Sequence, residues 1–111
     1  ALNLGSKLGM DPKVLSSIMC TASSRCWSVD TYNPEPGFLG GLPADRDYEN
    51  GFGCELLLKD LKIAQEIAEK SDANIDSGLL SLSNYEKLCA DGFGKKDFGY
   101  LYKIIQEQGH K

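Results

Sequence analysis

The chain has 111 residues, enough for one domain with a buried core, and its 41% hydrophobic and 25% charged residues are typical of a globular domain. The net charge of −4 comes without any block of basic residues, which argues against a nucleic-acid partner. No apolar run approaches the ~20 residues of a membrane span, so we expect no membrane partner either.

The cysteines Cys20, Cys26, Cys54 and Cys89 form no Cys-x-x-Cys pair, and the single histidine, His110, lies at the tail. This spacing argues against a zinc site, and we expect no metal. The chain is neither short nor loop-rich enough to need cross-links. We therefore predict free thiols in a reducing compartment.

The first residues predict the end of one helix and the start of another. Residues 1–8 are typical of a helix that stops at Gly9, so we expect the chain to be cut from a longer protein. Asp11 followed by Pro12 is a strong helix start. The inner face of this second helix is expected to hold Val14, Leu15, Ile18 and Met19.

Residues 25–32 favour a short helix, in which Trp27 is either a core aromatic or part of a site. Residues 33–53 then form a long Gly/Pro-rich loop without periodicity. Such loops are usually functional or disordered. Its apolar residues favour packing over disorder: Phe38, Leu39, Leu42, Tyr48 and Phe52.

The helix predicted from Glu55 to about Lys70 is the element around which the chain is organised. Its core-facing stripe is expected to contain Leu57, Leu61, Ala64 and Ala68. Asp60 sits between apolar turns. It is either a cap or a buried acid satisfied by backbone donors of the loop, or it lines a polar site with Phe52 and Lys59. Lys59 could instead form a surface pair with Glu55, four residues earlier.

Two further helices complete the pattern. One is capped by Asp76-Ser77 and ends at Gly92, and the last is capped by Asp97 and ends at Gly109. No convincing strand period appears. The predicted fold class is all-α, a compact bundle of about five or six helices with one long Gly/Pro-rich loop.

Separated motifs then resemble one family. They are Arg25-Cys-Trp-Ser-x-Asp-Thr-Tyr-Asn-Pro-x-Pro-Gly37, Tyr48-x-x-Gly-Phe52, Leu58-Lys-Asp-Leu61 with Ala64-Gln65, and Gly92-Phe-Gly-Lys-Lys-Asp-Phe98. In this order they resemble the 3-hydroxyisobutyrate dehydrogenases of the β-hydroxyacid dehydrogenase family. The resemblance covers nearly all of the chain and implies a C-terminal domain like that of 6-phosphogluconate dehydrogenase.

The resemblance implies that residues 1–111 are the C-terminal helical domain of such an enzyme. The N-terminal Rossmann domain with its dinucleotide fingerprint and the family's catalytic Lys are absent from this chain. The implied parent oxidises 3-hydroxyisobutyrate to methylmalonate semialdehyde with NAD in valine breakdown. The cofactor would be bound mainly by the missing domain, so we expect this chain alone to be inactive and to hold no catalytic residue.

The resemblance also implies site residues. Lys59 would approach the nicotinamide side of the cofactor, and the substrate pocket would contain Trp27, Tyr32, Phe52 and Asp60. Self-association as a dimer or tetramer through this domain is implied as well. The Arg-Cys-Trp variant implies the mitochondrial matrix, or the cytoplasm if the source is bacterial.

Two other functions stay open. One is a non-enzymatic helical interaction module derived from the same family, and the other is a dehydrogenase for another small 3-hydroxy acid. The choice between NAD and NADP also stays open, because the ribose-reading residues are not in this chain. A Gly-rich fingerprint upstream would favour the enzyme over the module.

Overall fold

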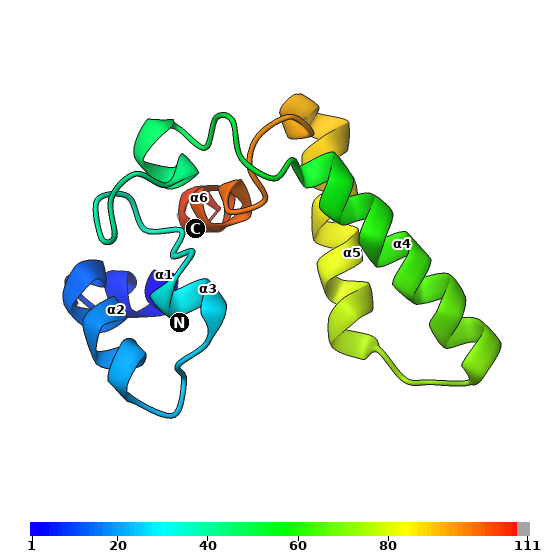
Figure 1. The fold of residues 1–111 in the computed structure, drawn as a ribbon, viewed down its shortest axis with the longest axis horizontal. Coiled ribbons are helices and arrows are strands. Elements are labelled where there is room, and N and C mark those ends of the chain that lie inside the picture. The colour runs from blue at the N-terminus through cyan, green and yellow to red at the C-terminus, as the bar shows by residue number, and fades with distance from the viewer. Residues whose placement is uncertain (109–111) are drawn as a thin grey trace.

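The computed structural model describes residues 1–108 and contains helices but no strand within that range. The all-α prediction is confirmed (Figure 1). Two short turns of other helical types, η1 (Pro43–Arg46) and η2 (Cys89–Phe93), accompany the α-helices. The α-helices are α1 (Leu2–Lys7), α2 (Pro12–Thr21), α3 (Trp27–Asp30), α4 (Cys54–Ser71), α5 (Asp76–Leu88) and α6 (Tyr100–Glu107).

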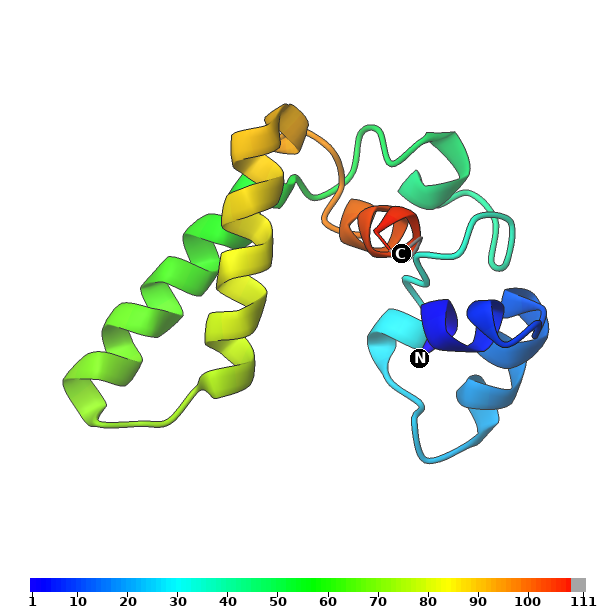
Figure 2. The same cartoon turned by 180° about the vertical axis from the view of Figure 1, so that it is seen from behind.

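The helices form two groups joined by the long loop. The short helices α1 to α3 lie together on one side, near α6, while α4 and α5 form a hairpin that projects on the other side (Figure 1). The view from behind shows the same division, with the loop passing beside α6 before it enters α4 (Figure 2). Side chains from α3, the loop, α4 and the segment before α6 nevertheless line one pocket.

The predicted start of α2 is confirmed. Pro12 is its first residue, and the Asp11 side chain accepts a hydrogen bond from the Lys13 N–H at 2.8 Å, which satisfies one free donor of the first turn. Gly109, the expected end of the last helix, and His110 lie outside the described residues.

The predicted inner face of α2 is wrong in part. Val14 and Ile18 are 55% and 52% exposed, whereas Ser16 is buried. The reason is a polar contact that hydrophobic periodicity does not reveal. The Asn33 amide donates hydrogen bonds to Ser16 Oγ at 3.2 Å and to the carbonyl of Val29 at 2.9 Å, which turns the Ser16 side of α2 inward.

The main core joins the loop to the helices. Buried Tyr48 from the loop meets Tyr100 of α6 edge to face, with ring centroids 5.6 Å apart. The Tyr48 hydroxyl donates to the carbonyl of Pro34 at 2.8 Å. The same cluster takes in Cys54 and Leu88 from the base of the hairpin. The expectation that the long loop packs is confirmed at Tyr48, whereas Leu39 and Phe52 of the same loop are exposed.

The core-facing stripe of α4 is confirmed at three of its four positions. Leu57 and Leu61 pack against the core and Ala68 is buried, but Ala64 is exposed. The hairpin projects from the rest of the chain, so α5 is the main neighbour of α4 along its outer half. Other elements therefore cover fewer turns of α4 than they would cover on a helix at the centre of a bundle.

No helix among residues 1–108 is both long enough and apolar enough to cross a bilayer. The same residues contain no group of His, Cys, Asp and Glu side chains arranged to hold a metal ion.

The cysteines yield a direct test. All four, at positions 20, 26, 54 and 89, are free thiols in the structure, so thiol titration of the denatured, unreduced chain should find four. In the native chain Cys26 should react first because it is exposed, and Cys54 last. Burial raises the pKa of the Cys54 thiol to about 12, which suppresses its reactive thiolate. Finding two thiols or none would reveal a disulfide.

Candidate functional site

Three aromatic rings lie parallel to one another at the base of the hairpin. Trp27 of α3 stacks on Tyr32 with ring centroids 4.9 Å apart and planes 9° apart. Tyr32 stacks in turn on Phe98, at 5.4 Å and 2°. Phe52 meets Phe98 edge to face at 6.0 Å. Chain segments far apart in the sequence thus build one continuous aromatic surface, which we call the aromatic wall: Trp27, Tyr32, Phe52 and Phe98.

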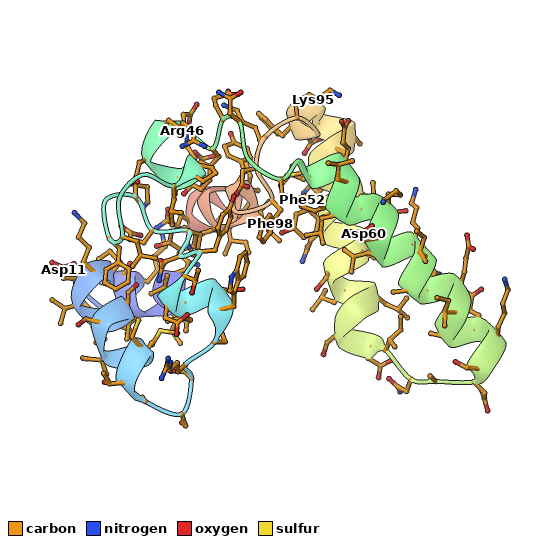
Figure 3. The ribbon with its side chains drawn as sticks, viewed as in Figure 1. Asp11, Arg46, Phe52, Asp60, Lys95 and Phe98 are labelled. Carbon is orange, nitrogen blue, oxygen red and sulfur yellow. The ribbon has the colours of Figure 1, made fainter. Side chains whose placement is uncertain are left out.

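The aromatic wall borders a pocket of about 370 Å³, to which Leu57 of α4 adds the remaining side. Trp27 is 56% exposed and Phe52 is 41% exposed. Exposed aromatic side chains that gather in a pocket are typical of a surface that binds a ligand or another domain. Figure 3 shows Phe52 and Phe98 together where the chain enters α4, with Asp60 farther along that helix. This pocket is the candidate functional site.

A buried carboxylate lies behind the aromatic wall. Asp97 is only 2% exposed, and its Oδ1 accepts hydrogen bonds from the Tyr32 hydroxyl at 2.8 Å and from the Phe52 N–H at 2.9 Å. Its Oδ2 accepts a third from the Gly99 N–H at 2.8 Å. Together, burial and the Asp97 bond raise the pKa of Tyr32 to about 12. The phenol therefore stays protonated and donates at neutral pH.

Two glycines make room for this carboxylate. A Cβ added at Gly51 would overlap Asp97 Oδ1, and one added at Gly99 would lie 2.9 Å from Oδ2. Both positions are therefore restricted by close approach of the backbone to Asp97. An isolated bridge between Gly53 and Asp97 further ties the two segments together.

The structure brings together three of the four predicted pocket residues, namely Trp27, Tyr32 and Phe52. It does not place Asp60 among the lining residues. The expectation of a buried Asp60 is wrong, because its side chain is 49% exposed and pairs with Lys59 at 2.9 Å. The acid that receives the loop's backbone donors is Asp97 instead.

The predicted surface pair between Lys59 and Glu55 is not found either, because the Glu55 carboxylate pairs with the Lys95 ammonium at 2.7 Å. Neighbours on an α-helix point about 100° apart, so the Lys59 side chain must bend toward Asp60 to form its pair. Asp60 follows Leu57 by three residues and lies one turn along the same side of α4. Lys59 itself does not line the pocket, although its helix supplies Leu57 to the lining.

Sequence reasoning missed Asp97 and Phe98 as site residues. Asp97 was expected only to cap the last helix, but that helix begins at Tyr100. Of the three hydrogen bonds that the Asp97 carboxylate accepts, only the one from the Gly99 N–H comes from a near neighbour in the chain. Asp97 and Phe98 close the motif Gly92-Phe-Gly-Lys-Lys-Asp-Phe98, which the family resemblance includes but does not assign to the site.

The chain resembles known dehydrogenases over nearly its full length. It is 44% identical over 108 residues to "3-hydroxyisobutyrate dehydrogenase, mitochondrial" of Homo sapiens, covering 97% of this chain and 32% of that relative. It is 38% identical to the protein of the same name in Drosophila melanogaster, again over 97% of the chain and 33% of that relative. The chain thus spans about a third of the length of the curated relatives it matches.

A solved structure supports the same relationship. The Mycobacterium tuberculosis 3-hydroxyisobutyrate dehydrogenase, determined with L-serine, matches with a TM-score of 0.87 and 30% identity, over 93% of this chain and 35% of that one. The family described as NAD-binding of NADP-dependent 3-hydroxyisobutyrate dehydrogenase matches residues 1–105. Because this match covers nearly the whole chain, the chain belongs to the family of NAD-binding domains of 3-hydroxyisobutyrate dehydrogenases.

Proposed function

We propose that the chain is the C-terminal helical domain of an NAD(P)-dependent dehydrogenase that oxidises 3-hydroxyisobutyrate to methylmalonate semialdehyde. The family match over residues 1–105 is the observation that carries the proposal. The apolar pocket at the base of the hairpin supplies a matching site, because its volume of about 370 Å³ suits a small acid or the flat ring of a cofactor.

The chemistry divides between this chain and the rest of the protein. In the oxidation, a hydride leaves the carbon that carries the 3-hydroxyl group and the hydroxyl proton passes to a base, so the alcohol becomes an aldehyde. The bound nicotinamide supplies the hydride acceptor. The described residues lining the pocket include no carboxylate, histidine or lysine, so we assign the base to the part of the protein outside this chain.

The residues of this chain are proposed to bind and orient the substrate and the cofactor. The aromatic wall is proposed to hold the alkyl part of the substrate and to exclude water, with Trp27 and Phe52 covering the open side. Lys59 is proposed to contact the nicotinamide side of the cofactor, and Asp60 to hold the Lys59 ammonium at the edge of the pocket. The two side chains pair at 2.9 Å on α4, the helix that also supplies Leu57 to the pocket.

The substrate class is small 3-hydroxy acids. L-serine, present with the mycobacterial relative, is itself a 3-hydroxy acid, which supports a pocket that accepts more than one 2-substituent. For the parent protein we propose NAD as the cofactor in valine breakdown and a location in the mitochondrial matrix. The relatives from animals, a slime mould and a plant that carry mitochondrial names support this location.

Turnover by two forms of the protein tests the proposal. The full-length protein should reduce NAD or NADP with 3-hydroxyisobutyrate, whereas the 111-residue chain alone should show no turnover above a blank. Turnover by the chain alone would overturn the assignment of the base to the part of the protein outside this chain. Lack of turnover by the full-length protein with a panel of 3-hydroxy acids and both cofactors would instead favour a non-enzymatic interaction module.

We also propose that the domain carries self-association into a dimer or tetramer. Leu39 of the loop and Leu79 and Leu80 of α5 are exposed, and Leu56, Ile63 and Ile67 expose a second apolar stripe on α4. Residues 56, 63 and 67 recur on one face of α4, and an exposed apolar helix face is typical of a protein interface. Sedimentation of the full-length protein should therefore show a dimer or tetramer. A monomer whose mass is independent of concentration would contradict the proposal.

A further inference from the structure

Asp97 links the two segments that present phenylalanines to the pocket. Phe98 is its neighbour in the chain, and the Phe52 N–H bonds to its carboxylate at 2.9 Å. In the other direction, the Phe98 N–H donates to the Phe52 carbonyl at 2.8 Å. The two phenylalanines are thus joined by reciprocal hydrogen bonds, one of them through the Asp97 side chain, and their rings meet edge to face.

The third member of the aromatic wall depends on the same carboxylate. The Tyr32 hydroxyl reaches Asp97 Oδ1 at 2.8 Å, and the Tyr32 ring lies between Trp27 and Phe98 in the parallel stack. A ring held at its hydroxyl end cannot slide along its stacked neighbours. Because Asp97 is buried and itself fixed by the Gly99 N–H, it forms a rigid anchor for Tyr32 and for Phe52.

We propose that Asp97 is a positioning residue that fixes the aromatic wall through Tyr32 and Phe52, and so determines how closely the pocket fits the 2-substituent of its 3-hydroxy acid. The selectivity part of this inference rests on the proposed function. The positioning part does not, because it concerns only the described residues of this chain. Asp97 does not line the pocket, so it acts through its neighbours and not on the substrate.

Tyr32→Phe is the sharpest variant, because it deletes one hydroxyl and leaves the ring in place. The two backbone N–H groups that donate to the Asp97 carboxylate are also kept. Tyr48→Phe is its matched control, since it deletes another 2.8 Å hydrogen bond, to the carbonyl of Pro34, from a tyrosine that does not line this pocket. Asp97→Asn is the second variant. It keeps the shape but replaces one acceptor oxygen by an amide that cannot accept.

The first readout is the ratio of kcat/KM for 3-hydroxyisobutyrate to kcat/KM for 3-hydroxypropionate in the full-length protein. These substrates differ by one methyl group, and a ratio is unaffected by the fraction of folded enzyme. Tyr32→Phe should lower the ratio by about threefold to tenfold, the range that one net hydrogen bond supplies. Asp97→Asn should lower it at least as much, and Tyr48→Phe should leave it unchanged. A Tyr32→Phe ratio equal to that of the wild type would overturn the inference.

The second readout needs no activity. Trp27 is the single tryptophan of the chain and stacks on Tyr32, so its time-resolved fluorescence anisotropy reports the order of the aromatic wall. In the 111-residue chain, Tyr32→Phe and Asp97→Asn should increase the local motion of Trp27, while Tyr48→Phe should not. Equal motion in all variants would overturn the positioning role. Inactive full-length wild type with increased motion in these variants would overturn only the proposed function.

Discussion

Replacing Asp97 with alanine should destabilise the chain by about 3–5 kcal/mol, because three donors lose their acceptor inside the protein. The Tyr32 hydroxyl and the N–H groups of Phe52 and Gly99 all point at this carboxylate. Each buried polar group left without a partner costs about 1–3 kcal/mol, and total stability is typically about 5–15 kcal/mol. Urea unfolding of the 111-residue chain measures the loss.

Asp45→Ala is the matched control for this experiment. Asp45 also accepts two backbone N–H groups, from Gly37 at 2.6 Å and Leu42 at 3.0 Å, but it is exposed. Water can replace the lost carboxylate there, so the effect should be much smaller than at Asp97. Equal urea midpoints for Asp97→Ala and the wild type would show that the buried bonds contribute nothing to stability.

Replacing Lys59 with alanine should reduce kcat/KM of the full-length protein by at least about tenfold, because loss of a charged contact in the transition state typically costs a few kcal/mol. The melting temperature should hardly change. The Lys59 and Asp60 side chains are 62% and 49% exposed, and ion pairs of this kind contribute only ~0–1 kcal/mol. Steady-state kinetics with both substrates varied, together with thermal unfolding, separates the two effects.

Lys62→Ala on the same helix controls for loss of a surface charge. The Lys62 side chain is comparably exposed, and its Nζ lies 3.7 Å from Oε1 of Glu86 in α5. Neither residue lines the pocket. Lys62→Ala should retain wild-type kinetics. If Lys59→Ala also retains near-full activity, its pair with Asp60 is only a surface contact and the assignment of Lys59 to the cofactor is wrong.

Local signals predicted the elements of this fold well. Asp11 and Pro12 marked the start of α2, and the long run without Pro or Gly marked α4 to within a residue at each end. These boundaries were predictable because caps and periodicity depend on neighbours in the chain. Trp27, Tyr32 and Phe52 do meet in one pocket, but they were predicted from the resemblance to a known family and not from local signals.

The failures concern contacts between distant residues. Asp97 bonds to Tyr32 across 65 positions and to Phe52 across 45, and no periodic pattern encodes such pairs. Asp60 seemed buried because apolar residues flank it. The projecting hairpin, however, leaves much of α4 in contact with α5 alone. Which face of a helix is covered depends on tertiary packing, which also explains the exposed Val14 of α2.

The most direct test of the proposed function is the effect of Trp27→Ala on kcat/KM for 3-hydroxyisobutyrate in the full-length protein. Trp27 is the most exposed member of the aromatic wall, so its removal should spare the fold while opening the pocket. We expect a fall of about tenfold or more. Val14→Ala, at a similarly exposed apolar residue of α2, should have no effect. Unchanged kcat/KM in Trp27→Ala would contradict the assignment of this pocket to the substrate.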